Sequence, residues 1–288
     1  MVLQVYWDFG LMNLAVSWLY KFLRFCRQKQ KIFIITLLWF GLKKPVPAQI
    51  TPNGLRTEVN RTGNTIHITG GKRGGNNLFH SFGQFNVQTG ETANFWSNPG
   101  ITNILARVNG GSPSYINGLI QVLGGKSNLF LLNPSGIVFG ANAALNVPAA
   151  FVASTANRVT FPNGVFDMHT QNVEGLAGNP LALMDLGNGR IEINGAKLSA
   201  PEGVTLAAGG GLLADGAKIS TDRGVTLVGR KDGFVEIRTE GNILGFAVRR
   251  DELQKTTSIY QLPELLTGNG RLTVRNSEIQ GQSAQLLG

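Results

Sequence analysis

Cysteine is nearly absent from this chain of 288 residues, in which Cys26 is the only one. The residues after position 48 therefore contain no cysteine, which excludes disulfides and cysteine-based metal sites from that part of the chain. Histidine is also scarce, with three residues, and a serine–histidine–aspartate arrangement cannot be argued from them. We expect no cofactor and no metal site.

Clustered acidic residues are missing as well. An enzyme that acts on polysaccharides needs several Asp or Glu on one face, for calcium or for acid and base roles. The acids of the second half stand singly, at Asp167, Glu174, Asp185, Glu192, Glu202, Asp215 and Asp222. Glu202 and Asp222 fall near equivalent positions of a repeat, but each lies in a turn where charge is expected. No catalytic residue is predicted, and a polysaccharide-acting enzyme is the less favoured alternative.

No apolar run is long enough to cross a membrane. The longest run, residues 32–42, has eleven residues, whereas a hydrocarbon core requires about 20. Five basic residues between Lys21 and Lys31 precede this run, and Val46-Pro47-Ala48 follows it with small residues. This order predicts an extended export signal over residues 1–48, which the general export machinery recognises and signal peptidase cleaves between Ala48 and Gln49. The true start is either Met1 or Met12.

The formal charge of +9 belongs mostly to this leader. Residues 1–48 hold seven Lys or Arg and one acid, so the remainder carries a net charge of about +3. Its basic residues are scattered among turns and lack the interleaved aromatic residues of a nucleic-acid surface. Nucleic acid is therefore excluded as a partner.

Short strands joined by tight turns are the pattern of residues 76–147. Apolar residues alternate with small or polar ones in short bursts, and Gly, Asn or Pro ends each burst. The aromatic residues Phe79, Phe82 and Phe85 are predicted to cap one end of a stacked-strand core. His80, which lies between them, is expected to be a packed or hydrogen-bonded structural residue.

The chain also repeats itself. Residues 195–206 match residues 216–227 at an offset of 21, with eight of the twelve positions identical, and residues 187–193 recur at 268–274, an offset of 81 that is close to four such periods. Short strands with Gly at their corners and a period near twenty are typical of a parallel β-helix, because a coil buries its inward Val, Leu and Ile only against another coil. Residues 249–266 break the period and are predicted to be an extrahelical excursion.

Two Asn-Pro pairs mark turns. Asn accepts a hydrogen bond from the backbone two residues further on, and Pro presets φ, so Asn98-Pro99 and Asn133-Pro134 each begin a turn. Gly136 supplies the positive φ from which the next strand can start. By contrast, the phosphate-loop likeness of residues 124–127 is rejected, since position 120 is Ile where the loop requires Gly.

The motifs Phe79-His80-Ser81-Phe82-Gly83-Gln84-Phe85-Asn86-Val87 and Leu131-Leu132-Asn133-Pro134-Ser135-Gly136-Ile137 resemble the N-terminal secretion domain of filamentous haemagglutinin-type exoproteins, the passengers of two-partner secretion. The resemblance is close over residues 49–158. In that family, Asn-Pro-Asn-Leu and Asn-Pro-Asn-Gly mark the domain. Here the second survives with Ser135 in place of Asn, and the first only as Asn98-Pro99-Gly100-Ile101, which favours a role in fixing the fold over direct contact with a transporter.

The resemblance and the repeats together predict an all-β protein, a right-handed parallel β-helix with an N-terminal cap and extrahelical hairpins. Residues 49–158 would form the cap and first coils, and residues 159–288 the continuing coils. The resemblance implies recognition by the periplasmic domains of an outer-membrane two-partner secretion transporter, and a protein that is secreted or held at the cell surface after passing the periplasm.

Two alternatives remain open. In the first, the rod is an adhesin that binds cell-surface ligands. In the second, the chain is a truncated fragment of a longer exoprotein, since such exoproteins are usually much longer and the repeat pattern runs to the final residues. The sequence does not identify the transporter or the ligand.

Overall fold

The computed structural model describes residues 50–231, 234–240, 243–249 and 272–288, and all regular elements in these ranges are β-strands. The predicted export signal, together with Ala48 and Gln49, lies outside the described residues. Within the described ranges, the structure contains no helix long and apolar enough to cross a membrane.

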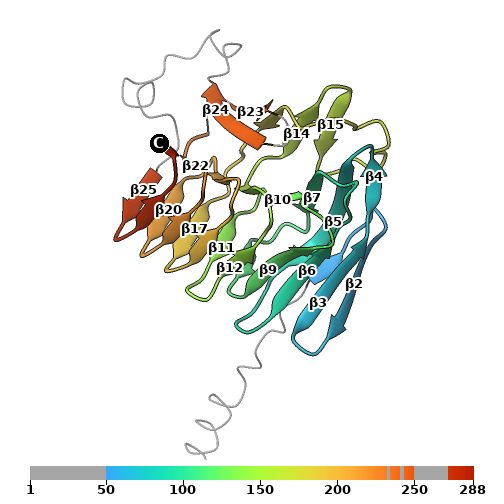
Figure 1. The fold of residues 1–288 in the computed structure, drawn as a ribbon, viewed down its shortest axis with the longest axis horizontal. Helices are drawn as coiled ribbons and strands as arrows, with labels where there is room; N and C mark the ends of the chain where they lie inside the picture. Colours follow the sequence, from blue (N-terminus) through green and yellow to red (C-terminus); the bar gives the residue numbers. More distant parts are fainter. Residues whose placement is uncertain (1–49, 232–233, 241–242, 250–271) are drawn as a thin grey trace, which may run out of the picture. The chain divides into compact units, whose positions relative to one another are not determined.

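The chain winds through three sheets in turn, which we call A, C and B (Figure 1). One coil consists of β10 in sheet A, β11 in sheet C and β12 in sheet B, and the next strand, β13, returns to lie parallel beside β10, with Leu129 opposite Phe151. Successive coils repeat this path. The predicted parallel β-helix is therefore confirmed.

Sheets B and C form two walls of the coils. Sheet C comprises β8 (Ser114–Ile116), β11 (Ile137–Phe139), β17 (Ile191–Asn194), β20 (Leu212–Asp215) and β25 (Leu272–Arg275). Sheet B comprises β2 (Thr57–Thr62), β3 (Thr65–Gly70), β6 (Thr92–Trp96), β9 (Leu119–Leu123), β12 (Ala144–Asn146), β18 (Lys197–Ser199), β21 (Lys218–Ser220) and β26 (Glu278–Gln280). Their residues alternate between buried and partly exposed, because one face of each sheet points inward and the other meets water.

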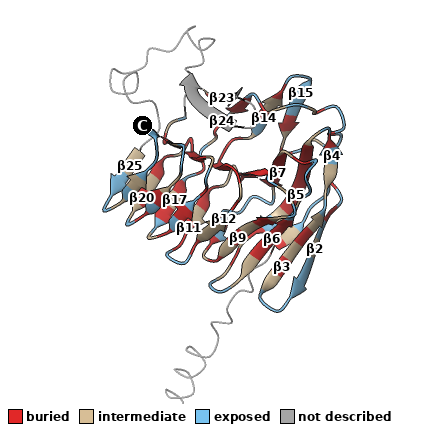
Figure 2. Cartoon of the chain, in the orientation of Figure 1, coloured by how far each residue is buried: buried red, intermediate tan, exposed pale blue. Residues whose placement is uncertain are grey.

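Sheet A is the third wall, and its central strands are buried on both faces (Figure 2). It comprises β1 (Ile50–Pro52), β4 (Lys72–Gly74), β5 (Asn77–Phe85), β7 (Asn103–Val108), β10 (Asn128–Leu132), β13 (Phe151–Ser154), β19 (Val204–Ala207), β22 (Gly224–Val228) and β27 (Ser283–Leu287). Every residue of β7, β10, β13 and β19 is buried. Such continuous burial requires a second layer outside the coils.

The second layer is an antiparallel sheet, D, made from two excursions. It comprises β14 (Arg158–Phe161), β15 (Gly164–Asp167), β16 (Ala182–Met184), β23 (Phe234–Glu240) and β24 (Ile243–Arg249). The first excursion leaves between β13 and β17 and the second between β22 and β25, so both leave from the corner between sheets A and C. They meet where β16 pairs with β23. The helix therefore does not continue directly after residue 158, and the second excursion begins before residue 249; residues 250–266 lie outside the described ranges.

The register confirms one repeat and corrects the interpretation of the other. Val204 lies opposite Val225 and Leu198 opposite Ile219, so the offset of 21 is one coil. Ile191 is stacked under Leu212, which is stacked under Leu272. The offset of 81 therefore spans two coils, one of which contains the second excursion, and not four regular periods.

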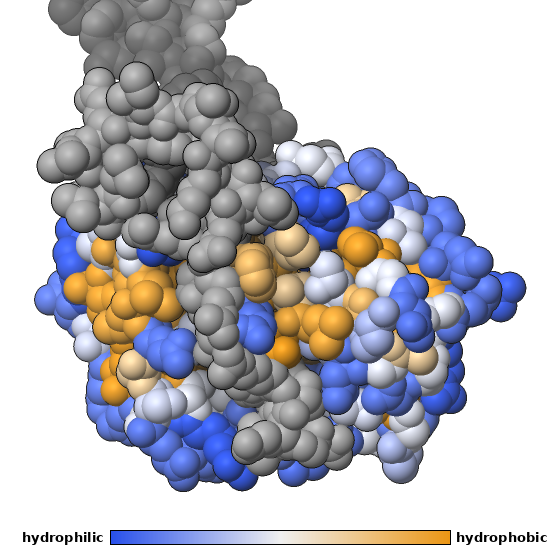
Figure 3. Space-filling model, turned by 90° about the horizontal axis from the view of Figure 1, so that it is seen from above, coloured by the Kyte–Doolittle hydropathy of each residue, from blue (hydrophilic) through white to orange (hydrophobic). Residues whose placement is uncertain are grey.

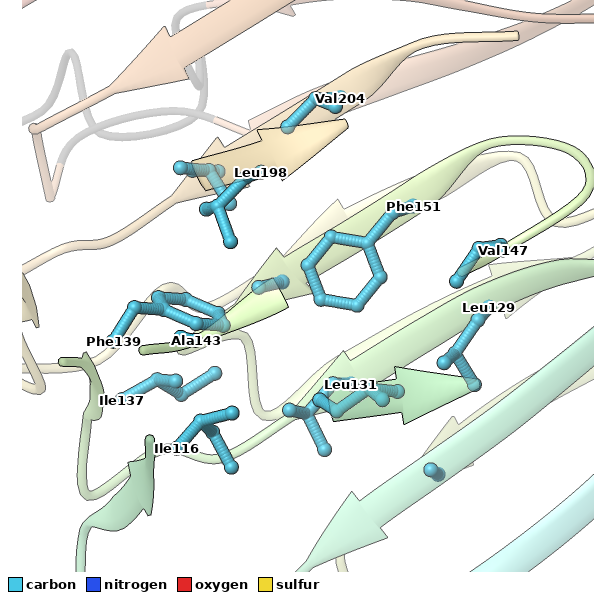
Figure 4. Packing of buried hydrophobic residues seen from close by; sticks show 14 of the residues in the cluster. Ile116, Leu129, Leu131, Ile137, Phe139, Ala143, Val147, Phe151, Leu198 and Val204 are labelled. Carbon is cyan, nitrogen blue, oxygen red and sulfur yellow. The ribbon is translucent and has the colours of Figure 1, made fainter. Parts of the chain in front are cut away.

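The interior of the coils is one apolar cluster. Figure 4 shows Leu129 and Leu131 of β10 and Phe139 of β11 in the same interior as Phe151 of the next coil. A second cluster lies between sheets A and D, and Phe79 belongs to it, whereas Phe82 and Phe85 belong to the interior. The three aromatic residues therefore do not form one cap. A spacing of three turns Phe79 and Phe82 to opposite faces of the strand, whereas an irregularity in the pairing between Phe82 and Gln84 returns Phe85 to the inner face.

The last described coil, β25–β26–β27, exposes apolar residues. Val274 is 36% and Leu286 49% exposed, whereas Ala214 and Leu227, their partners in the coil beneath, are fully buried. Figure 3 shows hydrophobic residues gathered toward this side of the surface.

Replacing an inward residue of a central coil should destabilise the whole stack. Leu206→Ala removes a fully buried side chain of β19 and should lower the free energy of unfolding by about 2 to 5 kcal/mol, since a cavity remains. Urea unfolding measures the change. Leu213→Ala, on the half-buried outer face of β20, is the control and should cost clearly less; an equal cost would contradict the assignment of faces.

Candidate functional site

Asn133 makes the corner between sheets A and C in the coil of β10. Its side-chain Nδ2 donates to the Ser112 carbonyl and to Ser114 Oγ, both at 3.0 Å, and its Oδ1 accepts from the Ser135 backbone N–H at 3.0 Å. The last of these bonds is the predicted Asn turn. The residue is fully buried, so its amide joins the turn to the preceding coil out of contact with solvent.

The rest of this motif completes the turn. The Gly136 N–H donates to the Asn133 carbonyl at 3.0 Å, and Gly136 has a φ of +118°, as predicted. A Cβ at Gly136 would lie 2.9 Å from the Arg190 carbonyl oxygen. Ile137 then opens β11 and donates its N–H to that same oxygen. The motif that comprises Asn133, Pro134, Ser135, Gly136 and Ile137 therefore determines how closely the next coil packs against this corner.

The Asn98-Pro99 corner repeats the same local geometry in a different place. The Gly100 N–H donates to Asn98 Oδ1 at 2.9 Å, and the Ile101 N–H donates to the Asn98 carbonyl at 3.0 Å. Unlike Asn133, both Asn98 and Pro99 are exposed. This corner joins sheet B to sheet A.

The fold does not bring the two motifs together. Asn98 precedes β7 and Asn133 follows β10, and these strands are parallel neighbours in sheet A. The two corners therefore lie at opposite ends of a five-residue strand, roughly 17 Å apart. They form two separate structural sites, one buried and one on the surface.

A ladder of three asparagines, which the sequence analysis missed, connects the first coils. Asn103 Nδ2 donates to Asn77 Oδ1 at 2.8 Å, and Asn128 Nδ2 donates to Asn103 Oδ1 at 2.9 Å. The ladder ends at Asn128, whose Oδ1 accepts a hydrogen bond from the Ala150 backbone N–H at 3.0 Å. A signal was present: each asparagine directly precedes a buried apolar run, at spacings of 26 and 25.

Polar side chains of the first coils also bind a loop of the first excursion, residues 167–178. Fully buried Arg107 donates through Nη1 to the carbonyls of Asp167 and Thr170, both at 2.7 Å, and through Nε to Ser81 Oγ at 2.9 Å. Asn77 Nδ2 donates to two further loop carbonyls. Burial lowers the pKa of Arg107 to about 10, although the nearby negative charge of Asp167 acts to raise it. The guanidinium therefore stays charged at neutral pH.

His80 lies on the inner face of β5, where its ring packs 6.1 Å from Phe82 and 5.8 Å from Phe95 between centroids. Neither ring nitrogen has a hydrogen-bond partner among the described residues. Burial lowers the pKa of His80 from 6.5 to about 4, so the imidazole is neutral at pH 7. The predicted structural role is confirmed, as a packed rather than a hydrogen-bonded residue.

Several acidic residues of the described ranges form single ion pairs. Glu202 pairs with Lys126, Asp185 with Arg158 and Asp215 with Arg275. Over the same ranges, no three His, Cys, Asp or Glu side chains gather in a way that could hold a metal ion.

Two comparisons with known proteins found matches. A family model described as TPS secretion domain matches residues 47–281. The crystal structure of the HMW1 secretion domain from Haemophilus influenzae is similar, with a TM-score of 0.48 and 18% identity; the match covers 70% of this chain and 48% of that chain. The match thus spans about half the length of that chain. No curated protein matches the sequence.

Removing the two turn asparagines should have unequal effects. Asn133→Ala leaves the Ser112 carbonyl and the Ser135 N–H without their buried partner and should lower the free energy of unfolding by about 2 to 4 kcal/mol. Asn98→Ala, at an exposed corner, should cost less than about 1 kcal/mol. Asn133→Asp keeps the acceptor but sets a buried carboxylate against the Ser112 carbonyl oxygen, so it should not restore the wild-type urea midpoint. Equal costs at the two corners would contradict the assigned roles.

His80 should make stability depend on acid pH. Because its folded pKa, about 4, lies below the unfolded value of 6.5, its stabilising contribution is complete above pH 6.5 and is lost as the pH falls toward 4. The loss should reach about 3 kcal/mol. Chemical unfolding of wild type and His80→Leu at pH 7 and pH 4 measures this term. A loss of the same size in His80→Leu would show that other groups cause it.

Proposed function

The chain belongs to the TPS secretion domain family, and from this premise we propose that the periplasmic domains of a dedicated outer-membrane barrel transporter recognise its cap and first coils, residues 49–158. The match over residues 47–281, which runs through both Asn-Pro corners, carries the proposal. The chain is a passenger domain of two-partner secretion, and membership of the family implies a secreted exoprotein that is exported through the outer membrane.

Residues 1–48 act in this proposal as an export signal that signal peptidase removes. Two observations support cleavage between Ala48 and Gln49. The family match begins at residue 47, and the first strand, β1, begins at Ile50, so cleavage leaves the whole β-helix intact. The processed chain would then pass the periplasm before it meets the transporter.

The two Asn-Pro corners contribute differently. Asn133 is fully buried in the folded chain, so a partner can reach it only before folding, and its contribution to secretion comes through the stability of the first coils. Asn98 and Pro99 remain on the surface after folding. The Asn133 to Ile137 segment is therefore assigned to folding, and the exposed Asn98-Pro99 corner is the one that remains accessible.

Folding outside the cell supplies a directional driving force. Each coil that stacks buries inward apolar residues such as Val225 and Leu227, which are fully covered only when the neighbouring coil is present. Stacking coils therefore oppose return of the chain through a pore that admits only unfolded polypeptide. This role requires no catalysis, and the single ion pairs of Asp185, Glu202 and Asp215 support a non-enzymatic protein.

Fractionation of the tagged chain in its own host tests the export route. We expect a chain that begins at Gln49 in the medium or at the cell surface, and retention in the periplasm when the outer-membrane transporters of this class are deleted. N-terminal sequencing identifies the cleavage site. An uncleaved chain in the inner membrane, or release that persists without such transporters, would refute the proposal.

Disrupting a coil tests the driving force. Val225→Asp with Leu227→Asp places two charges in the apolar interior and should lower the secreted amount severalfold by preventing stacking. Asn194→Asp with Ser199→Asp adds the same charges at exposed positions of neighbouring strands and should leave secretion unchanged. Unchanged secretion of an unfolded interior variant would contradict a role for folding in export.

A further inference from the structure

A small pocket lies beside the exposed Asn98-Pro99 corner. Its volume is about 220 Å³, and it crosses the corners of successive coils between sheets B and A. Pro99 and Ile101 form an apolar wall, Gly125 and Ala149 are small residues of the lining, and Glu202 contributes the carboxylate. The pocket therefore combines a narrow apolar wall with one acidic group.

The Glu202 carboxylate is only half satisfied. Its Oε1 pairs with Lys126 Nζ at 2.5 Å, whereas its Oε2 is buried and has no hydrogen-bond partner within the described part of the chain. The Lys126 side chain is 68% exposed. The Glu202 side chain is only 15% exposed, so its carboxylate needs a cation, and another cation can take the place of the exposed Lys126 ammonium.

We propose that this pocket binds the guanidinium of an arginine side chain presented by a partner polypeptide. A guanidinium that replaces the Lys126 ammonium can form two parallel N–H···O bonds with the carboxylate, whereas an ammonium acts as a point charge. The methylene stem of the arginine would pack against Pro99 and Ile101, as long basic side chains do on apolar surfaces.

The pocket exists only in the folded protein, because its residues come from four successive coils between Pro99 and Glu202. An arginine-bearing partner therefore meets the chain after folding. The proposal is independent of the export route, and a chain that failed to use a transporter would still carry the pocket.

Titration calorimetry of the purified full-length chain with N-acetyl-arginine amide tests the site. We expect binding that Glu202→Gln weakens at least tenfold, because the neutral amide loses the charge and one acceptor. Lys126→Met should strengthen binding about two- to fivefold by removing the competing ammonium. N-acetyl-lysine amide should bind clearly more weakly than the arginine probe.

Glu192→Gln is the matched control, since this carboxylate lies on the outer face of sheet C and outside the pocket lining. It should leave the affinity unchanged. Thermal melting of each variant verifies the fold. Absence of binding by both the wild type and Lys126→Met would overturn the proposal, as would equal affinity in Glu202→Gln or equal binding of the lysine probe.

Discussion

Sheet A carries apolar side chains on both faces, and each face needs a cover that another part of the chain must supply. Sheets B and C cover the inner face coil by coil. Sheet D covers the outer face, and its strands come from two excursions that are far apart in the sequence. Strands β5 and β7 are consequently complete only when the loop of residues 167–178 has docked, so the earliest coils depend on a segment translated much later. This dependence links the first coils and the extrahelical sheet through direct contacts.

Buried polar groups fix how these layers meet. The asparagine ladder, the Arg107 guanidinium and the Asn133 amide each bond partners one coil away or in the docked loop. In sheet A, where both faces are apolar, packing alone would tolerate a shifted register, whereas a shift of one residue would leave these groups buried without partners. Their contribution is therefore to the choice of one arrangement among several compact ones. His80 differs, since it occupies an apolar interior without a polar partner among the described residues.

Local chemistry and periodicity were readable from the sequence, and long-range pairing was not. The repeat of 21 residues gave the register of consecutive coils, and the Asn-Pro pairs gave the turns, because each rests on contacts between a residue and its immediate neighbours in chain or coil. The side of sheet A on which Phe79 lies could not be predicted without knowing that this sheet has an outer layer. Arg107 looked like any scattered basic residue, since the carbonyls that it binds lie 60 and 63 residues away in a loop without a repeat. The pairing of β16 with β23 is equally non-local.

Both excursions leave the stack from one corner, between sheets A and C, and at that corner the other coils turn within a few residues. Inserting tens of residues there leaves the strands above and below in register, as the stacking of Ile191, Leu212 and Leu272 shows. Because the entropy of closing a loop grows only slowly with its length, such insertions cost little once the corner is held. This corner can therefore accept insertions that differ in length and sequence, through natural variation or protein engineering, while the stacked coils keep their structure.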